Sequence, residues 1–331
     1  MKPVHLASNR PPRRFYRGGA QLGALRGEPV GAEYEPEDWV ASTTTVRGEE
    51  RLGLTALPDG TLLRDAVAGH PAAWLGAAHA ERWGADTRLL VKLLDAGQRL
   101  PVHAHPHDEF ASAHLGAAHG KAEAWYILRG GVVHLGLRED VTHERIAALV
   151  TSQDVEGLLG LLHRIDVAPG DVVWVPPGEL HAIGAGVLLL ELQQPEDLSI
   201  LLEWRDFAID GAAQGHLGLG FELALAAVNL RARSREELGG LVRRSPEAGS
   251  VLPADAEAYF RLERLPVHRR ATIGRGFAVI LVRSGEVAVA GERFGSGSTV
   301  LVPDAAGALV AEGSGELLIA RPPSPDARNG V

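Results

Sequence analysis

Short apolar runs separated by glycine and proline turns dominate the chain from residue 87 onward. The segment TRLLVKLLDAG is an apolar run closed by a turn, and KAEAWYILRGGVVHLGL predicts two strands on either side of Gly130-Gly131. The segment RIDVAPGDVVWVPPGELHAIGAGVLLLELQQ repeats this alternation of strand and turn, with PGD and PPG as its turns. The pattern therefore predicts a mainly β fold.

Helical spacing of apolar residues occurs in a few limited stretches. It predicts a helix near residues 72–83, two short helices over residues 142–164 and helical structure over residues 217–241. Residues 245–256 are poor in large apolar groups and predict a linker. These helices are insertions in a chain that is otherwise built from strands.

The two halves of the chain share a weak internal repeat. GSGSTVLVPDAAGAL echoes PGDVVWVPPGELHAI as turn, apolar strand, V-P, turn and second strand, but it has no counterpart of His181. We therefore expect two similar β units, only one of which carries chemistry. The predicted order is residues 1–86 as the start of the first unit, 87–210 as its core, 211–250 as a helical segment and linker, and 251–331 as the second unit.

Composition and charge narrow the classes of function. Lys and Arg total 33 against 42 Asp and Glu, so the net charge is −9, which argues against nucleic acid or an anionic membrane as the main partner. The sequence has no cysteine, which excludes disulfides, thiolate metal sites and cysteine nucleophiles. We find no apolar run long enough for a transmembrane helix and no secretory leader, and we expect a cytoplasmic protein.

Three histidines and one glutamate form the candidate chemical site. His103 and His105 are two residues apart, so on a strand they point to the same face. Glu123 lies in the next apolar run, and His181 follows the PPG turn. Imidazole and carboxylate together suit a divalent first-row metal. Three further histidines fall outside this order and are expected to be solvated: His107, His114 and His119.

The order of these residues resembles the two motifs of the cupins, which are H-x-H with a later glutamate and glycine turn, and P-x-G-x-x-H. Here the motifs fall on His103, His105, Glu123 and Gly130, and then on Pro176, Gly178 and His181. A closer resemblance follows from LVKLLDAGQRLPVHAHPHDEFA, HGKAEAWYIL and VAPGDVVWVPPGELHAIGAGVLLLELQQPED. These segments, within residues 90–197, are similar to the class I mannose-6-phosphate isomerases, while residues 277–322 resemble that family's second, metal-free barrel.

This resemblance implies two cupin-type jelly-roll β-barrels with a small helical insertion. It also implies one divalent metal held by His103, His105, Glu123 and His181. The family carries a glutamine where this chain has His103, so the implied ligands are three imidazoles and one carboxylate. Zinc is the expected metal, and the extra imidazole widens the choice to manganese, iron or nickel.

A second departure concerns a cation. The family pattern places an active-site arginine at the position of Leu201, and Arg205 is the nearest candidate to replace it. Lys121 is expected to share the cavity with Glu123, and Glu191 is the candidate general base. An arginine makes bidentate contacts with anions that a leucine cannot make.

The resemblance implies a metal-dependent aldose–ketose isomerase acting on a small sugar or sugar phosphate. The leading reaction interconverts mannose 6-phosphate and fructose 6-phosphate through a cis-enediolate. Three alternatives remain open: an isomerase of an unphosphorylated sugar, a cupin oxygenase with the same ligands, and a sugar-binding protein without catalysis. A monomer or a homodimer is expected.

Overall fold

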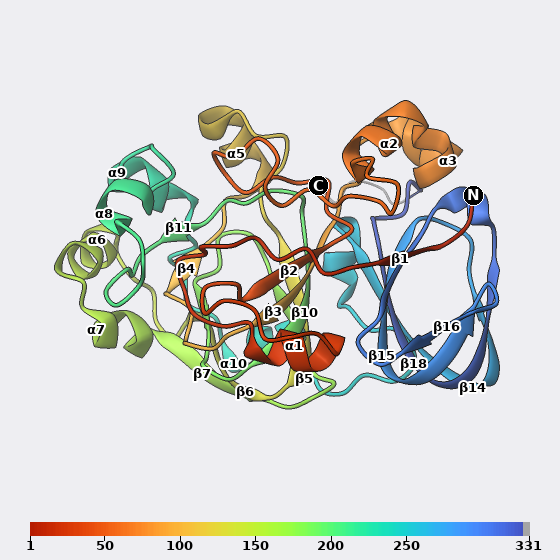
Figure 1. Cartoon of the computed structure of the whole chain (residues 1–331). Helices are drawn as coiled ribbons and strands as arrows, with labels where there is room; N and C mark the ends of the chain where they lie inside the picture. The colour runs from red at the N-terminus through yellow and green to blue at the C-terminus, as the bar shows by residue number, and fades with distance from the viewer. Residues whose placement is uncertain (327–331) are drawn as a thin grey trace.

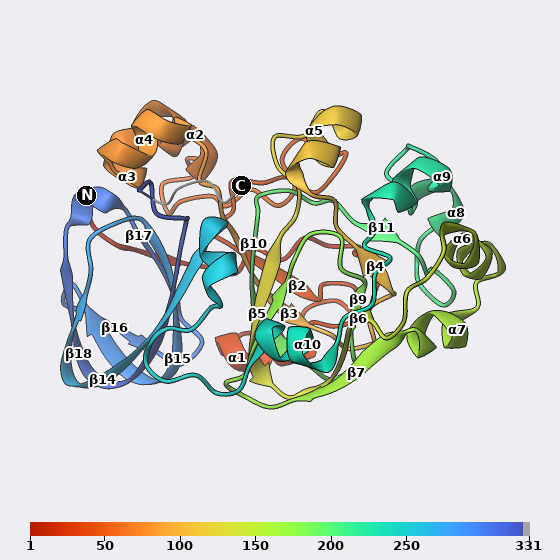
Figure 2. The same ribbon diagram turned by 180° about the vertical axis from the view of Figure 1, so that it is seen from behind.

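Three antiparallel sheets organise residues 1–326, the part of the chain that this computed structural model describes (Figures 1 and 2). Two of the sheets lie side by side near the middle of the molecule, and the third forms the barrel at one end. The prediction of a mainly β fold is therefore confirmed.

The first two sheets come almost entirely from residues 37–243. The six-stranded sheet has the order β12 (Val242–Arg243), β8 (Val172–Val175), β5 (Glu123–Arg129), β10 (Leu188–Gln193), β3 (Leu90–Asp95) and β2 (Glu37–Val40). The five-stranded sheet has the order β11 (Ile200–Leu201), β4 (His103–Ala104), β9 (His181–Ile183), β6 (Gly131–Leu137) and β7 (Leu162–Val167).

The third sheet is the C-terminal barrel, joined by one strand from the N-terminus. Its order is β1 (Val4–Leu6), β17 (Thr299–Val302), β15 (Ala278–Val289), β18 (Leu309–Arg321), β14 (Arg261–Ile273) and β13 (Gly249–Ser250), with β16 (Glu292–Gly295) paired to β15. Part of the predicted linker over residues 245–256 is thus a strand of this barrel. Figure 1 shows the N-terminal strand running to the barrel, where the guanidinium of Arg26, at the end of the first helix, donates to the carbonyl of Leu6 at 3.2 Å.

Gly130 lets the chain cross between the first two sheets. The strands predicted on either side of it are present, but β5 pairs with β8 and β10, whereas β6 pairs with β7 and β9. A Cβ atom at Gly130 would lie only 2.4 Å from the carbonyl oxygen of Val167. Because a side chain does not fit there, glycine permits the close approach that carries the chain from one sheet to the other.

The helices are short and lie outside the sheets. The N-terminal part of the chain contributes α1 (Ala20–Arg26), α2 (Leu63–Gly69), α3 (Pro71–Leu75) and α4 (Ala77–Trp83). The central part contributes α5 (Asp108–Leu115), α6 (His143–Ser152), α7 (Val155–Gly160), α8 (Gly211–Gln214), α9 (Phe221–Ala224) and α10 (Arg235–Leu241). Single 3₁₀ turns occur at Leu225–Ala227, Ala254–Ala258 and Asp304–Ala306.

Two of the three helical predictions are confirmed, and the third is only partly correct. The region near residues 72–83 is helical but breaks at Gly76, whose φ is 96°, and residues 142–164 contain two short helices. Residues 217–241 do not form one helix, because residues 228–234 are not helical. There the backbone N–H of Asn229 donates to the carbonyl of Gly178 at 2.8 Å instead of closing a helical turn.

Three apolar clusters hold these layers together. One joins the six-stranded sheet to the C-terminal barrel, where the ring of Trp174 packs against those of Tyr259 and Phe260. A second packs α5, α6, α7 and α9 against the five-stranded sheet, and Figure 2 shows α6, α7 and α9 at the end of the molecule opposite the barrel. The third fills the barrel itself. The candidate site therefore lies between two sheets, each supported from behind.

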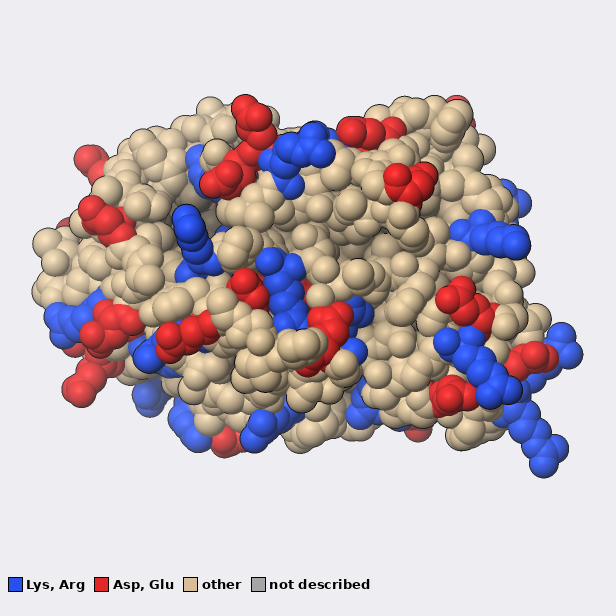
Figure 3. All heavy atoms as spheres, in the orientation of Figure 1, with Lys and Arg blue, Asp and Glu red and all other residues tan. Residues whose placement is uncertain are grey.

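Acidic and basic side chains are intermixed over the face drawn in Figure 3. Among the helices of residues 1–326, none has the length and apolar character needed to cross a membrane.

Candidate metal centre and its cavity

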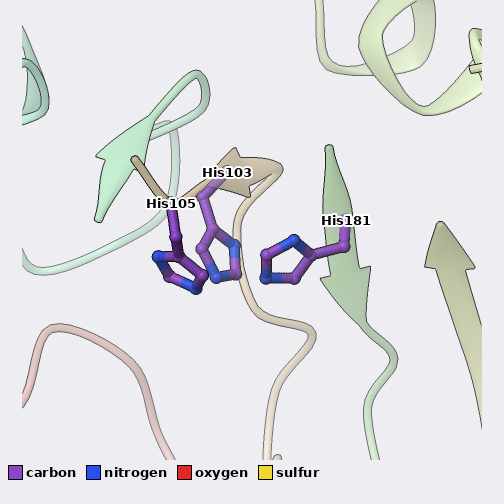
Figure 4. Close-up of side chains that lie close together, drawn as sticks. All are labelled: His103, His105 and His181. Atoms are coloured by element: carbon purple, nitrogen blue, oxygen red, sulfur yellow. The ribbon is translucent and has the colours of Figure 1, made fainter. Parts of the chain in front are cut away.

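The three predicted histidines meet at one point between the sheets (Figure 4). His103 and His181 are direct partners in the pairing of β4 with β9, and His105 follows β4. Their ligand atoms all lie within 4.8 Å of one another, and all three side chains are buried. The five-stranded sheet thus brings together residues that are about 80 positions apart in the sequence.

Each imidazole is oriented by a backbone carbonyl behind it. The Nδ1–H groups of His103, His105 and His181 donate to the carbonyls of Pro101, Leu198 and Glu179, at 2.8, 2.6 and 2.8 Å. A carbonyl oxygen only accepts, so the proton of each neutral ring is on Nδ1 and the lone pair is on Nε2. This arrangement of outer hydrogen bonds is the one that orients histidine ligands toward a metal.

Glu123 completes the cluster from the six-stranded sheet. Its Oε2 lies 3.0 Å from Nε2 of His105 and its Oε1 lies 3.1 Å from Nε2 of His181. The indole N–H of Trp125 donates to Oε1 at 3.1 Å and fixes the carboxylate. Nε2 of His181 is buried and makes no hydrogen bond within the described part of the chain. Such a nitrogen carries a lone pair available to a cation.

The electrostatics of the cluster suit a divalent cation. Burial, followed by the charge of Lys121, lowers the pKa of His105 to about 3, and burial holds the pKa of His103 well below its usual range. Burial alone would raise the pKa of Glu123, but Lys121 and the neighbouring histidines outweigh it and lower that pKa strongly. Neutral imidazoles and an ionised carboxylate are the protonation states that ligate metal, so these residues fit one.

Lys121 and Glu191, the other two cavity residues expected from the sequence, lie beside the cluster. The Lys121 ammonium donates to Oε2 of Glu123 at 2.8 Å and lies 2.9 Å from Nε2 of His105. It also lies 3.7 Å from Oε1 of Glu191. Burial, together with the charge of Glu123, raises the pKa of Glu191 to about 8. A carboxyl group with a pKa near neutrality is suited to both taking and giving a proton.

A cavity of about 480 Å³ opens from this cluster. Its polar lining includes five residues that the sequence reasoning missed: Arg14, Tyr16, Glu37, Lys92 and Asp197. They form one network. Lys92 Nζ lies 3.6 Å from Oε2 of Glu37 and 4.7 Å from the centre of the Trp39 ring, while the Tyr16 hydroxyl donates to Oε1 of Glu37 at 2.6 Å.

A sequence signal for Lys92 was available. The chain contains only three lysines, at positions 2, 92 and 121, against 33 basic residues in total. Two of these three lie in the cavity, and Lys92 interrupts a strand that is buried along its whole length. A buried lysine in a chain that otherwise uses arginine is therefore a candidate for a site that suits a compact ammonium.

Arg205 does not lie in the cavity. It follows the two-residue strand β11 after a turn, is exposed, and its side chain contacts the carbonyl of Ser152. The prediction that Arg205 could replace an arginine at position 201 required both residues to lie on one strand. Because β11 ends at Leu201, the two side chains do not share a strand face. Leu201 does line the cavity, as an apolar part of its wall.

The surrounding histidines differ from expectation at one position. His107 and His114 are exposed, and His107 caps helix α5 by accepting from the N–H of Phe110. His119 is buried, and its Nε2 lies 2.7 Å from Oδ2 of Asp86. The expectation that His119 is a solvated loop residue is wrong, because this ion-pair partner lies far away in sequence.

Comparison with known proteins shows which sequences this chain resembles. No family model matches the sequence. The chain is 30% identical over 248 residues to a Bacillus subtilis protein named "Probable mannose-6-phosphate isomerase GmuF", covering 71% of this chain and 75% of that one. It is 34% identical over 189 residues to mannose-6-phosphate isomerase of Streptococcus mutans, covering 54% of each.

Solved structures share the whole fold. Mannose 6-phosphate isomerase from Bacillus subtilis superposes with a TM-score of 0.75 at 22% identity, covering 97% of this chain and 100% of that one. The apo form of the enzyme from Salmonella typhimurium superposes with a TM-score of 0.71 at 17% identity, covering 98% and 99%.

These superpositions show a shared, mainly β fold, and the buried imidazole cluster lies within it. The match to the Bacillus subtilis protein GmuF covers 71% of this chain and 75% of that protein, which is enough to show the family. The chain belongs to the mannose-6-phosphate isomerase family, a family of sugar-phosphate isomerases.

Proposed function

We propose that the protein is a metal-dependent isomerase that interconverts mannose 6-phosphate and fructose 6-phosphate through a cis-enediolate. One observation carries the proposal: a buried ammonium and a carboxyl group with a pKa of about 8 lie against a cluster of three histidines and a carboxylate. This combination provides a cation site, a proton carrier and a hydrogen-bond donor in one cavity.

His103, His105, Glu123 and His181 are the proposed ligands of one divalent cation, with zinc as the favoured ion. When bound, the cation supplies Lewis-acid polarisation of the sugar's carbonyl oxygen. The three carbonyl acceptors at Nδ1 keep the ring nitrogens aimed inward, which limits reorganisation during binding.

Glu191 is the proposed proton carrier. In its ionised form it takes the proton from C2 of the aldose, and in its protonated form it returns that proton to C1 of the enediolate. A pKa of about 8 keeps both forms accessible near neutral pH. No oxidant or second substrate is required, since one proton leaves carbon 2 and one arrives at carbon 1 while the hydroxyl proton moves between the two oxygens.

Lys121 is the proposed stabiliser of the negative charge that develops on the sugar oxygens. Its ammonium is buried and already oriented by Glu123, so it donates to an oxyanion without prior reorganisation. The apolar wall made by Leu94, Leu100 and Leu201 limits access of water to the reacting atoms.

The test is an assay of metal-analysed protein against mannose 6-phosphate and free mannose in D₂O. We expect isomerisation of the phosphorylated sugar with deuterium incorporated at carbon, and loss of about 10²- to 10⁴-fold in kcat for Glu191→Gln with bound metal retained. Uptake of dioxygen without isomerisation would favour a cupin oxygenase instead. Turnover of free mannose alone would change the substrate but leave the proposed roles intact.

The cytoplasmic location and the monomeric or homodimeric state remain predictions. So do the sequence-based boundaries between residues 86 and 87, 210 and 211, and 250 and 251.

A further inference from the structure

The polar lining of the cavity has two separate ends. His103, Lys121, Glu123 and Glu191 lie at one end, and Arg14, Arg47 and Asp197 lie at the other. The strand order β5-β10-β3-β2 separates Glu123 from Glu37, which contacts Arg14. Three strand spacings amount to about 14 Å. Glu123 and Glu37 thus come from strands on opposite sides of β10 and β3, and both line the cavity.

Arg14 is held in place by two carboxylates. Its Nε donates to Oε1 of Glu37 at 3.2 Å, and its two Nη atoms donate to the carboxylate of Asp197 at 3.4 and 3.3 Å. Its side chain is 11% exposed, and it lines both this cavity and a neighbouring pocket formed with Arg13, Phe15 and Asp210. These bonds use three of the five donors of a guanidinium. The remaining donors are available to a ligand that enters the cavity.

Asp197 organises a second arginine at the same end. The backbone N–H of Arg47 donates to Oδ2 of Asp197 at 3.2 Å, and its exposed guanidinium donates to the carbonyl of Leu217 at 3.2 Å. Arg14 and Arg47 bring two positive charges to this end of the lining, against two negative charges on Glu37 and Asp197, while Lys92 pairs across the strands with Glu191. These formal charges balance, so an anionic group would be held here by charge-assisted hydrogen bonds from the guanidinium groups and not by a net charge.

Leu201 occupies the wall position at which the family pattern has an arginine. Leu201 is the register partner of His103 in the pairing of β11 with β4, so it lines the cavity next to the metal cluster. An apolar side chain at that point makes no hydrogen bond to a phosphate oxygen. The guanidinium groups in the lining of this cavity are those of Arg14 and Arg47.

We propose that Arg14, assisted by Arg47 at the mouth, binds the phosphate group of the sugar phosphate at the end of the cavity away from the three histidines. This inference rests on the proposed function and assigns the phosphate recognition that Leu201 and Arg205 do not provide. Arg14 comes from a segment 183 residues before Asp197, and only the packing of the N-terminal segment over the six-stranded sheet brings it to this end.

The experiment compares metal-loaded wild type with Arg14→Gln on mannose 6-phosphate and on free mannose, and measures binding of inorganic phosphate by calorimetry. Arg14→Gln is expected to lower kcat/KM for the phosphorylated sugar about 10- to 100-fold, mainly through KM, and to weaken phosphate binding by a similar factor. Turnover of free mannose, where measurable, stays within about twofold. Arg17→Gln is the matched control, since Arg17 is 52% exposed and outside the cavity lining.

Equal losses for both sugars with unchanged phosphate binding would overturn the inference and leave Arg14 with a structural role. Arg14→Gln leaves Glu37 and Asp197 without their shared cation, so Arg14→Gln with Asp197→Asn provides a second variant if the first does not fold. Leu201→Arg in the Arg14→Gln background is expected to restore part of the phosphate affinity. If wild type itself does not isomerise mannose 6-phosphate, the proposed function fails, while the phosphate-binding comparison still decides the role of Arg14.

Discussion

Oε1 of Glu123 lies 3.1 Å from Nε2 of His181, although these residues come from different sheets. This contact joins the six-stranded sheet to the five-stranded sheet at the metal centre. Glu123 is the candidate ligand that the six-stranded sheet contributes, because the three histidines all come from the five-stranded sheet or from the residues directly after one of its strands.

Replacing Glu123 by glutamine is expected to remove both metal and activity. The neutral amide lacks the charge that balances a divalent cation, so metal affinity falls more than the 10- to 100-fold typical of losing an outer-sphere partner. Metal content measured by elemental analysis after dialysis checks this. Glu109→Gln is the control, because that carboxylate is 86% exposed. Full metal content in Glu123→Gln would refute the ligand assignment.

The three lysines provide a second, internally controlled test. Lys121→Met removes an ammonium that contacts Glu123, Glu191 and His105, and we expect kcat/KM to fall about 10²- to 10⁴-fold. Lys2→Met, at an exposed position outside the cavity, is expected to leave the rate unchanged. Steady-state kinetics with equal metal loading distinguish a role of Lys121 in chemistry from a role in metal retention.

The network around Glu37 predicts a specific dependence of stability on pH. Burial would raise the pKa of Glu37, but Arg14 and Lys92 outweigh it and lower that pKa from 4.5 to about 2. Because the folded-state pKa is lowered, the stabilisation is complete above pH 4.5 and is lost as the pH falls toward 2. The full effect corresponds to about 3 kcal/mol, of which about 2 kcal/mol is lost between pH 6 and pH 3.

Urea unfolding at pH 6 and pH 3 measures this loss. We expect Glu37→Gln to lose about 2 kcal/mol less than wild type over that interval. The matched variant Glu33→Gln, at a side chain that is 65% exposed, keeps the wild-type dependence. Identical pH dependence in wild type and Glu37→Gln would show that the carboxylate is not held ionised by its neighbours.

The crossing between sheets at Gly130 predicts a position-specific loss of stability. Gly130→Ala places a Cβ atom 2.4 Å from the carbonyl oxygen of Val167, so the backbone of one sheet must shift, at a cost of about 1–3 kcal/mol. Gly160→Ala is the control, because no atom lies within 4 Å of a Cβ built there. A thermal melt in which both variants behave alike would contradict the role assigned to Gly130.

Much of the fold was predictable because its signals are local. Alternating apolar runs and glycine or proline turns located β3, β5, β6, β8 and β10, and helical spacing located α6 and α7. The pairing of strands was not predictable in the same way. No local sequence pattern predicts that β5 and β6 belong to different sheets, because sheet membership depends on which strands, distant in sequence, pair with each of them.

The sequence by itself predicted the residues of the candidate metal centre. His103 and His105 share a strand face by their spacing, and Glu123 and His181 follow in motifs whose order is specific. Lys121 was found for the same reason, because it lies two residues from Glu123 on the same run. Each of these inferences uses only distances along the chain.

The tertiary structure alone decided the rest of the cavity. Arg14, Glu37 and Asp197 are scattered from one end of the first 200 residues to the other, and no spacing rule connects them. The structure also shows that Arg205 does not line the cavity, because β11 ends at Leu201 and the alternation of side chains along the strand does not extend to residue 205. The physical reason is that a buried charge needs an opposite charge beside it, and that partner is supplied by whichever segment folding brings there.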